Sequence, residues 1–94
     1  MAGSLWVREI KRNKIRRDIV VPCPERDWLS SLTEACRKLD ISVPLVVERH
    51  GRDFRAFSQL RFLPEHFMEA VNFDRLEAEY FDPEDKRAQA KGED

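Results

Sequence analysis

The chain has 94 residues, of which 41% are hydrophobic and 37% are charged, and this length provides one hydrophobic core rather than two. Its 17 Lys and Arg against 18 Asp and Glu give a net charge of −1, so the whole-chain charge favours neither nucleic acid nor a membrane surface. The longest apolar stretch, residues 43–47, is far shorter than the roughly 20 residues of a membrane-spanning helix. The charged Arg8 also interrupts the N-terminal apolar residues before they reach the length of a signal-peptide core, so export is not expected.

These observations predict a cytoplasmic protein without a membrane span, with its two cysteines reduced. Residues 1–82 are expected to form a single compact domain. Residues 84–94 carry no apolar side chain larger than alanine, so residues 83–94 are expected to form a disordered or frayed charged tail.

Residues 4–21 predict a β-hairpin, because apolar and polar side chains alternate along residues 5–10 and again along residues 15–21. We expect the turn at Arg12-Asn13. The resulting cross-strand pairs are Ile10–Ile15, Trp6–Ile19, Glu9–Arg16 and Arg8–Arg17. The Arg8–Arg17 pair brings like charges together on the face that carries Trp6. A shift of the strand pairing by one residue would exchange the two faces of the hairpin.

Residues 24–39 predict one long amphipathic helix. Pro24 suits its first position, acidic residues lie near its start and basic residues near its end. Five apolar residues form one stripe of the kind that packs on a sheet: Trp28, Leu32, Ala35, Cys36 and Leu39.

The segment from residue 43 to residue 58 allows two interpretations. Because Val46 and Val47 are β-branched and Gly51 would interrupt a longer helix, we favour a strand over 44–48 and a short helix over 52–58. The alternative is one helix that begins at residues 42–44, with Phe54 and Phe57 on its buried side.

The remaining chain predicts a short strand over 60–63, a helical turn over 64–69 and a last strand over 73–81. The expected fold class is therefore α+β. A small, mostly antiparallel sheet begins with a hairpin and carries one long helix on one face, in the order β-β-α-β-(short α)-β-β.

No metal, cofactor or catalytic site is predicted. Cys23, Cys36, His50 and His66 are too far apart along the chain for a zinc knuckle. The two histidines are expected to be surface or capping residues. With only three glycines, the chain also lacks a phosphate-cradling loop.

Charged clusters provide the only candidate binding residues. Positions that suit an anionic partner are Arg8, Lys11, Arg12, Lys14, Arg16 and Arg17 around the hairpin, with Arg49, Arg52 and Arg55 further on. Positions that suit a cationic partner are Glu65, Glu69, Asp74, Glu77 and Glu79. Residues 1–64 carry a net charge of +5 (13 basic, 8 acidic) and residues 65–94 a net charge of −6 (4 basic, 10 acidic).

The sequence thus favours a small non-enzymatic module that binds a protein partner, or a second copy of itself through an exposed sheet edge. The alternative is a nucleic-acid-binding protein that uses the basic hairpin.

Overall fold

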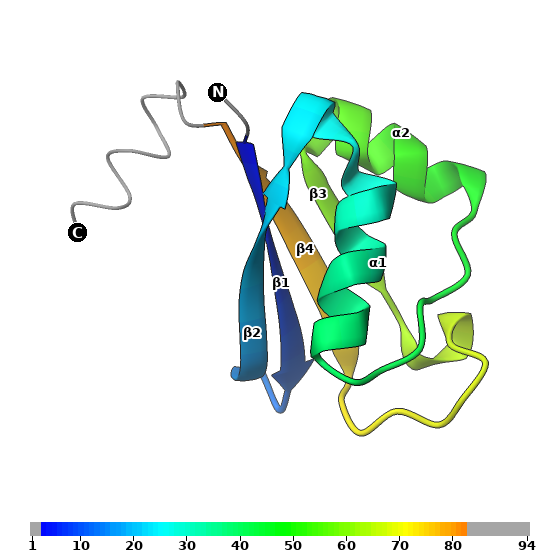
Figure 1. Ribbon diagram of the computed structural model, residues 1–94. Coiled ribbons are helices and arrows are strands. Elements are labelled where there is room, and N and C mark those ends of the chain that lie inside the picture. Colours follow the sequence, from blue (N-terminus) through cyan, green and yellow to red (C-terminus); the bar gives the residue numbers. More distant parts are fainter. Residues whose placement is uncertain (1–2, 83–94) are drawn as a thin grey trace.

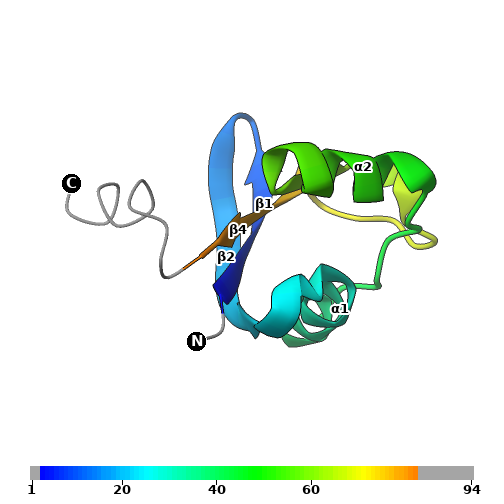
Figure 2. The same cartoon turned by 90° about the horizontal axis from the view of Figure 1, so that it is seen from above.

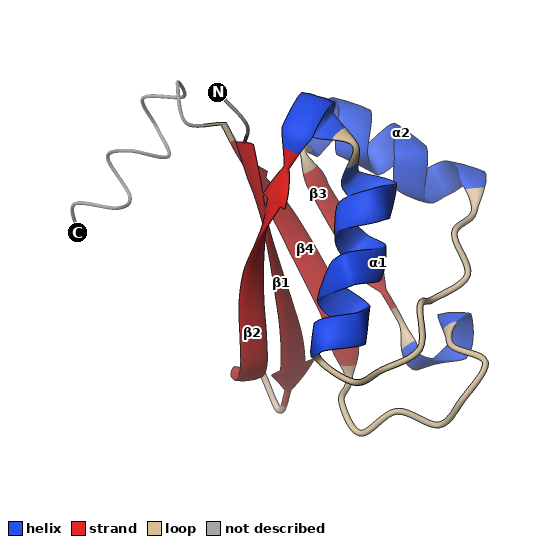
Figure 3. Cartoon of the chain, viewed as in Figure 1, coloured by secondary structure: helices blue, strands red, loops and turns tan. Residues whose placement is uncertain are grey.

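The computed structural model describes residues 3–82 and has the expected α+β class, with an antiparallel four-stranded sheet that starts with a hairpin (Figures 1 and 3). The predicted tail lies outside the described residues. The sheet order is β2-β1-β4-β3. The elements are β1 (Gly3–Lys11), β2 (Lys14–Cys23), α1 (Trp28–Lys38), α2 (Glu48–Phe57), β3 (Gln59–Phe62) and β4 (Arg75–Phe81), with 3₁₀ turns at Pro24–Arg26 and Pro64–His66.

The hairpin turn lies at Arg12-Asn13, as predicted. Both residues have positive φ, 54° and 63°, which is the requirement of the two-residue turn that matches strand twist. The predicted pair Ile10–Ile15 is also present. The turn was therefore correctly predicted from the sequence.

The register beyond this pair differs from the prediction, because it shifts between Glu9 and Ile10. Arg16 is the extra residue of a β-bulge, so Arg17 lies opposite Glu9 and Asp18 lies opposite Arg8. The predicted Trp6–Ile19, Glu9–Arg16 and Arg8–Arg17 pairs are therefore wrong. The bulge replaces an Arg–Arg contact with two pairs of opposite charge.

The first helix is shorter than expected. Its 11 residues begin after Asp27, whose carboxylate accepts a hydrogen bond from the Ser30 N–H and caps the helix. Pro24 starts a separate 3₁₀ turn. The predicted apolar stripe is present, with Leu32, Ala35, Cys36 and Leu39 buried and Trp28 partly buried.

The segment 41–47 contains no strand of the described sheet, in contrast to the strand expected over 44–48. It is extended chain, and its Leu45 N–H bonds to the His66 carbonyl. The second helix starts at Glu48 rather than at residue 52, and it includes Gly51. Two helices of similar length, instead of one long helix and one short one, therefore accompany the sheet.

Both helices lie on the same side of the sheet (Figure 2). The core lies between them and the inward side chains of the strands, which include Leu5, Val7, Phe62 and Leu76. The alternate side chains of the strands form the outer face of the sheet, which no described helix covers. No described helix is long and apolar enough to cross a membrane.

Candidate interaction surface

The predicted basic residues do not converge on one face. Around the hairpin, Lys11 and Arg16 bond to Asn72, and Arg17 bonds to Glu9 on the inner side of the sheet. Arg8 lies on the outer face. Arg49, Arg52 and Arg55 belong to α2, at some distance from the hairpin tip. Scattered placement of this kind favours solvation over a single anionic ligand.

Three arginines and two glutamates form an ion-pair cluster on the outer face. Arg8 lies 3.2 Å from Glu77 and 3.4 Å from Glu79, and Arg75 lies 2.6 Å from Glu77. Arg61 reaches Glu77 at 3.8 Å. The pKa of Glu77 is lowered, because the hydrogen bond from Arg75 and the charges of Arg75 and Arg8 together outweigh the opposing effect of burial.

The predicted basic and acidic sets therefore share one surface at this cluster. Of the other predicted acidic residues, Asp74 accepts a hydrogen bond from the backbone N–H of Arg12 at the hairpin turn. Glu65 lies in the 3₁₀ turn after β3, and Glu69 follows in the next loop; both are exposed. These residues do not form one acidic face.

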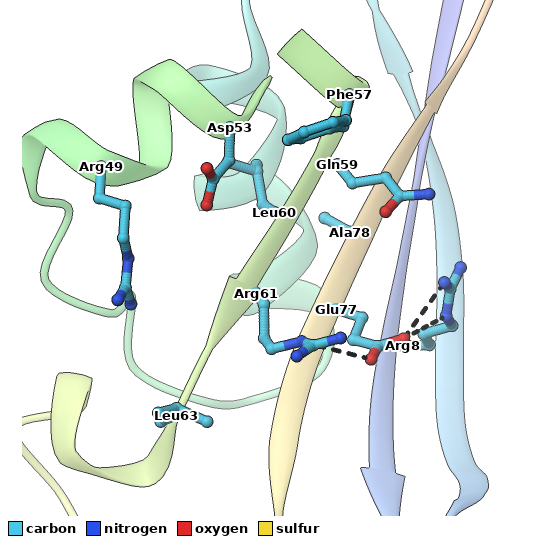
Figure 4. A pocket seen from close by; sticks show the side chains of 10 residues that line it. All are labelled: Arg8, Arg49, Asp53, Phe57, Gln59, Leu60, Arg61, Leu63, Glu77 and Ala78. Carbon is cyan, nitrogen blue, oxygen red and sulfur yellow. Dashed lines mark hydrogen bonds and ion pairs between the residues drawn. The ribbon is translucent and has the colours of Figure 1, made fainter. Parts of the chain in front are cut away.

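A groove of about 480 Å³ runs between α2 and the outer face of β3 (Figure 4). Its helix wall consists of Arg49, Asp53 and Phe57, one turn apart along α2. Its strand wall consists of Gln59, Arg61 and Leu63, which alternate along β3 and the residue that follows it. We call this feature the α2–β3 groove.

The polarity of the α2–β3 groove is mixed. Phe57 is 69% exposed, although it ends a helix whose other phenylalanine, Phe54, is buried. Glu77 and Arg8 close the groove on the sheet side. An exposed aromatic ring flanked by arginines is typical of protein interfaces.

Two histidines hold the backbone on the inner side of this groove. The Nδ1 atom of His50 accepts a hydrogen bond from the Val47 N–H at 3.0 Å, and that of His66 accepts one from the Leu63 N–H at 2.9 Å. The rings of His50 and Phe62 pack with their centroids 4.3 Å apart. The expectation that the histidines are capping residues is thus confirmed, but His50 is buried rather than on the surface.

Both cysteines are free and buried. Burial raises the pKa of Cys36 to about 12 and also raises that of Cys23, so both thiols stay protonated and are poor nucleophiles at neutral pH. Among residues 3–82, no three His, Cys, Asp or Glu side chains come close enough to hold a metal ion.

Comparison with known proteins provides no match: no protein-family model, no curated protein and no solved structure is significantly similar to this chain.

The sequence identified Arg8, Arg49 and Glu77 as candidate binding residues, and it also showed Arg61 and Phe57 in a cluster of arginines and aromatic residues. Phe57 was expected to be buried in the helix alternative, and Asp53, Gln59 and Leu63 carried no signal of their own. A helix that starts at residue 48 would have placed Arg49, Asp53 and Phe57 on one stripe, so the missing information was the start of α2.

Proposed function

We propose that this protein is a protein-interaction module that binds a partner protein through the α2–β3 groove. The observation that carries the proposal is the exposed ring of Phe57 in a groove that has arginines on both walls. Phenylalanine and arginine are both enriched in the cores of protein interfaces, and arginine is also enriched among the few residues that carry most of the binding energy.

The groove also suggests the chemistry of the partner segment. Arg49 makes no ion pair with a described residue, whereas Arg8 and Arg61 are partly neutralised by Glu77. An apolar side chain of the partner would pack on Phe57, and a carboxylate further along the partner segment would pair with Arg49.

A displayed library of random peptides tests this proposal. We expect the selected peptides to combine an apolar residue with an acidic one, and Phe57→Ala to weaken their binding by about tenfold. Met68→Ala is the matched control, because Met68 is equally apolar and 78% exposed but lies outside the groove. Selected peptides that bind Phe57→Ala as tightly as the unaltered protein would contradict the proposal.

A second candidate function is nucleic-acid binding by the hairpin, which the exposed Arg12, Lys14 and Arg16 near its tip favour. This function predicts that Arg12→Glu with Lys14→Glu abolishes binding and that affinity falls steeply with salt. The matched control is Arg52→Glu with Arg55→Glu, which changes the net charge equally on α2. Failure to bind single- or double-stranded DNA or RNA at about 50 mM salt would eliminate this function.

A further inference from the structure

Strand β2 is a long and exposed edge of the sheet. It is the first strand in the order β2-β1-β4-β3, and seven of its ten residues are exposed. No described element lies beyond it (Figure 1). Such an edge presents unpaired N–H and C=O groups that can bind another strand.

Pro22 shows which backbone groups point outward from this edge. Its carbonyl accepts a hydrogen bond from the Ser31 hydroxyl at 2.8 Å, and proline has no N–H to donate to β1. Because hydrogen-bonded and non-hydrogen-bonded positions alternate along an antiparallel strand, Val20 and Asp18 face the same way as Pro22. The free edge therefore presents the N–H and C=O groups of Asp18 and Val20.

We infer that β2 pairs antiparallel with β2 of a second copy of this chain, so that Asp18 of each copy lies opposite Val20 of the other. This register forms two hydrogen-bonded pairs around a two-fold axis at Ile19, and each pair exchanges two N–H···O bonds. The two sheets become one continuous sheet. The inference deepens the proposed function, since it names a second copy as one partner, but it uses a surface separate from the α2–β3 groove.

The neighbouring registers are less favourable. A shift toward the hairpin tip places Asp18 opposite Asp18, and like charges directly opposite each other are destabilising. A shift in the other direction places Asp18 opposite Pro22, which lacks an N–H and whose carbonyl is already bonded. Pairing of Asp18 with Val20 avoids both problems and covers Val20, which is 60% exposed.

Charge complementarity supports the same arrangement. In an antiparallel pair, the hairpin tip of one copy, with exposed Arg12 and Lys14, runs beside the residues that follow β2 in the other copy. These residues include the exposed Glu25 and Asp27. The intervening Arg26 is also exposed, but its guanidinium lies over the rings of Phe54 and Tyr80 at 4.7 and 4.6 Å. A basic tip therefore meets an acidic turn twice in the dimer.

Light scattering and sedimentation of the full chain measure the association. The mean mass of the unaltered protein is expected to rise with concentration from 11.1 kDa toward twice that value.

Charged substitutions of opposite sign at Val20 test the register. Val20→Glu places a carboxylate opposite Asp18 on both sides of the axis and should weaken association by about tenfold. Val20→Lys places an ammonium there and should leave association intact or strengthen it. Val46→Glu, an equal change on another exposed valine, should have no effect.

Amide hydrogen exchange provides an independent measurement. The amides of Asp18 and Val20 should become protected as the concentration rises, whereas the amide of Ile19, which faces β1, should be protected throughout. A mass of one chain at every concentration would overturn the inference, as would equal effects of Val20→Glu and Val20→Lys. Concentration-independent protection of Asp18 and Val20 in a monomer would show that the chain covers its own edge. Phe57→Ala should associate as the unaltered protein does, so the test of the β2 interface is independent of whether the α2–β3 groove binds a partner.

Discussion

At the scale of single residues, the bulge at Arg16 determines where the charges of the hairpin lie. It places Arg17 opposite Glu9, whose carboxylate accepts two hydrogen bonds from the guanidinium, at 3.2 and 2.7 Å. Arg17 also donates to the Leu39 carbonyl at the end of α1. Glu9 is completely buried, so this arginine supplies the charge partner that a buried carboxylate requires.

Replacement of Arg17 tests the importance of this pair. Arg17→Met should lower the free energy of unfolding by about 1–3 kcal/mol, because it leaves the carboxylate of Glu9 without its partner. The cost is limited by water, since the Arg17 side chain is itself 47% exposed. Urea unfolding measures it, and Arg37→Met on the exposed side of α1 is the control. A double variant with Glu9→Met as well should recover part of the loss; if it is no more stable than Arg17→Met, the pair is not the cause.

His50 makes stability depend on pH. Burial lowers its pKa below the ordinary value of 6.5, and the nearby charges of His66 and Arg49 lower it further, against the opposing influence of the Arg61 carbonyl and Asp53. The unfolded chain therefore takes up this proton first as the pH falls below about 6.5. It follows that the folded state loses stability through this window.

Substitution of His50 by glutamine separates titration from capping. Glutamine at this helix position can still accept the Val47 N–H, as in a capping box, but it does not titrate. We expect the melting temperature of the unaltered protein to fall between about pH 7 and pH 5, and that of His50→Gln to fall less. His66→Gln controls for the second histidine. Parallel pH profiles of the unaltered protein and His50→Gln would refute this assignment.

At the scale of the elements, local signals in the sequence predicted those parts whose structure is determined locally. The turn at Arg12-Asn13, the helix face around Leu32, the strand near residues 60–63 and the Pro64 turn are all present. The bulge was not predictable from alternation, because an extra residue exchanges the two faces of a strand, and the adjacent Arg16 and Arg17 give no apolar signal that locates this exchange. The start of α2 was missed because the backbone cap that His50 provides acts against the local signals of Val46, Val47 and Gly51.

The hairpin turn provides a prediction at this scale. Arg12 and Asn13 both adopt left-handed backbone angles, which cost less for asparagine and glycine. Arg12→Asn with Asn13→Gly should therefore raise the free energy of unfolding by about 0.5–1 kcal/mol. The backbone N–H that bonds Asp74 is retained. Arg12→Gln removes the same charge without the turn preference and should not stabilise the protein; stabilisation by both variants would indicate relief of charge repulsion instead.

At the scale of the whole molecule, the order of the strands places acidic residues from the C-terminal part of the sequence beside basic residues from the N-terminal part. The acidic strand β4 lies between β1 and β3, which supply Arg8 and Arg61. The sequence shows the two charged halves but not this order, because strand order depends on long-range pairing. For the same reason it could not reveal the α2–β3 groove, whose residues come from four different elements.

Glu77 connects this cluster to the proposed groove. Glu77→Gln removes the carboxylate shared by Arg8, Arg61 and Arg75, so the free energy of unfolding should fall by about 1 kcal/mol at low salt. Added salt should reduce the difference, because it screens both the lost attraction and the new repulsion among the arginines. Because the pKa of Glu77 is lowered, its contribution to stability is complete at neutral pH and is lost as the pH falls below about 4.5. The acid limb of the stability profile should therefore be shallower in Glu77→Gln.

The same substitution should act in the opposite direction on binding. Without Glu77, the groove retains Arg8, Arg49 and Arg61 against Asp53 alone, so its potential becomes more positive. Acidic peptides selected on the unaltered protein should bind Glu77→Gln more tightly, with most of the gain lost at high salt. Glu65→Gln, an equal charge change outside the groove, should leave their affinity unchanged. Weaker binding to Glu77→Gln would mean that the carboxylate itself contacts the peptide and that the groove accepts a basic side chain at this end.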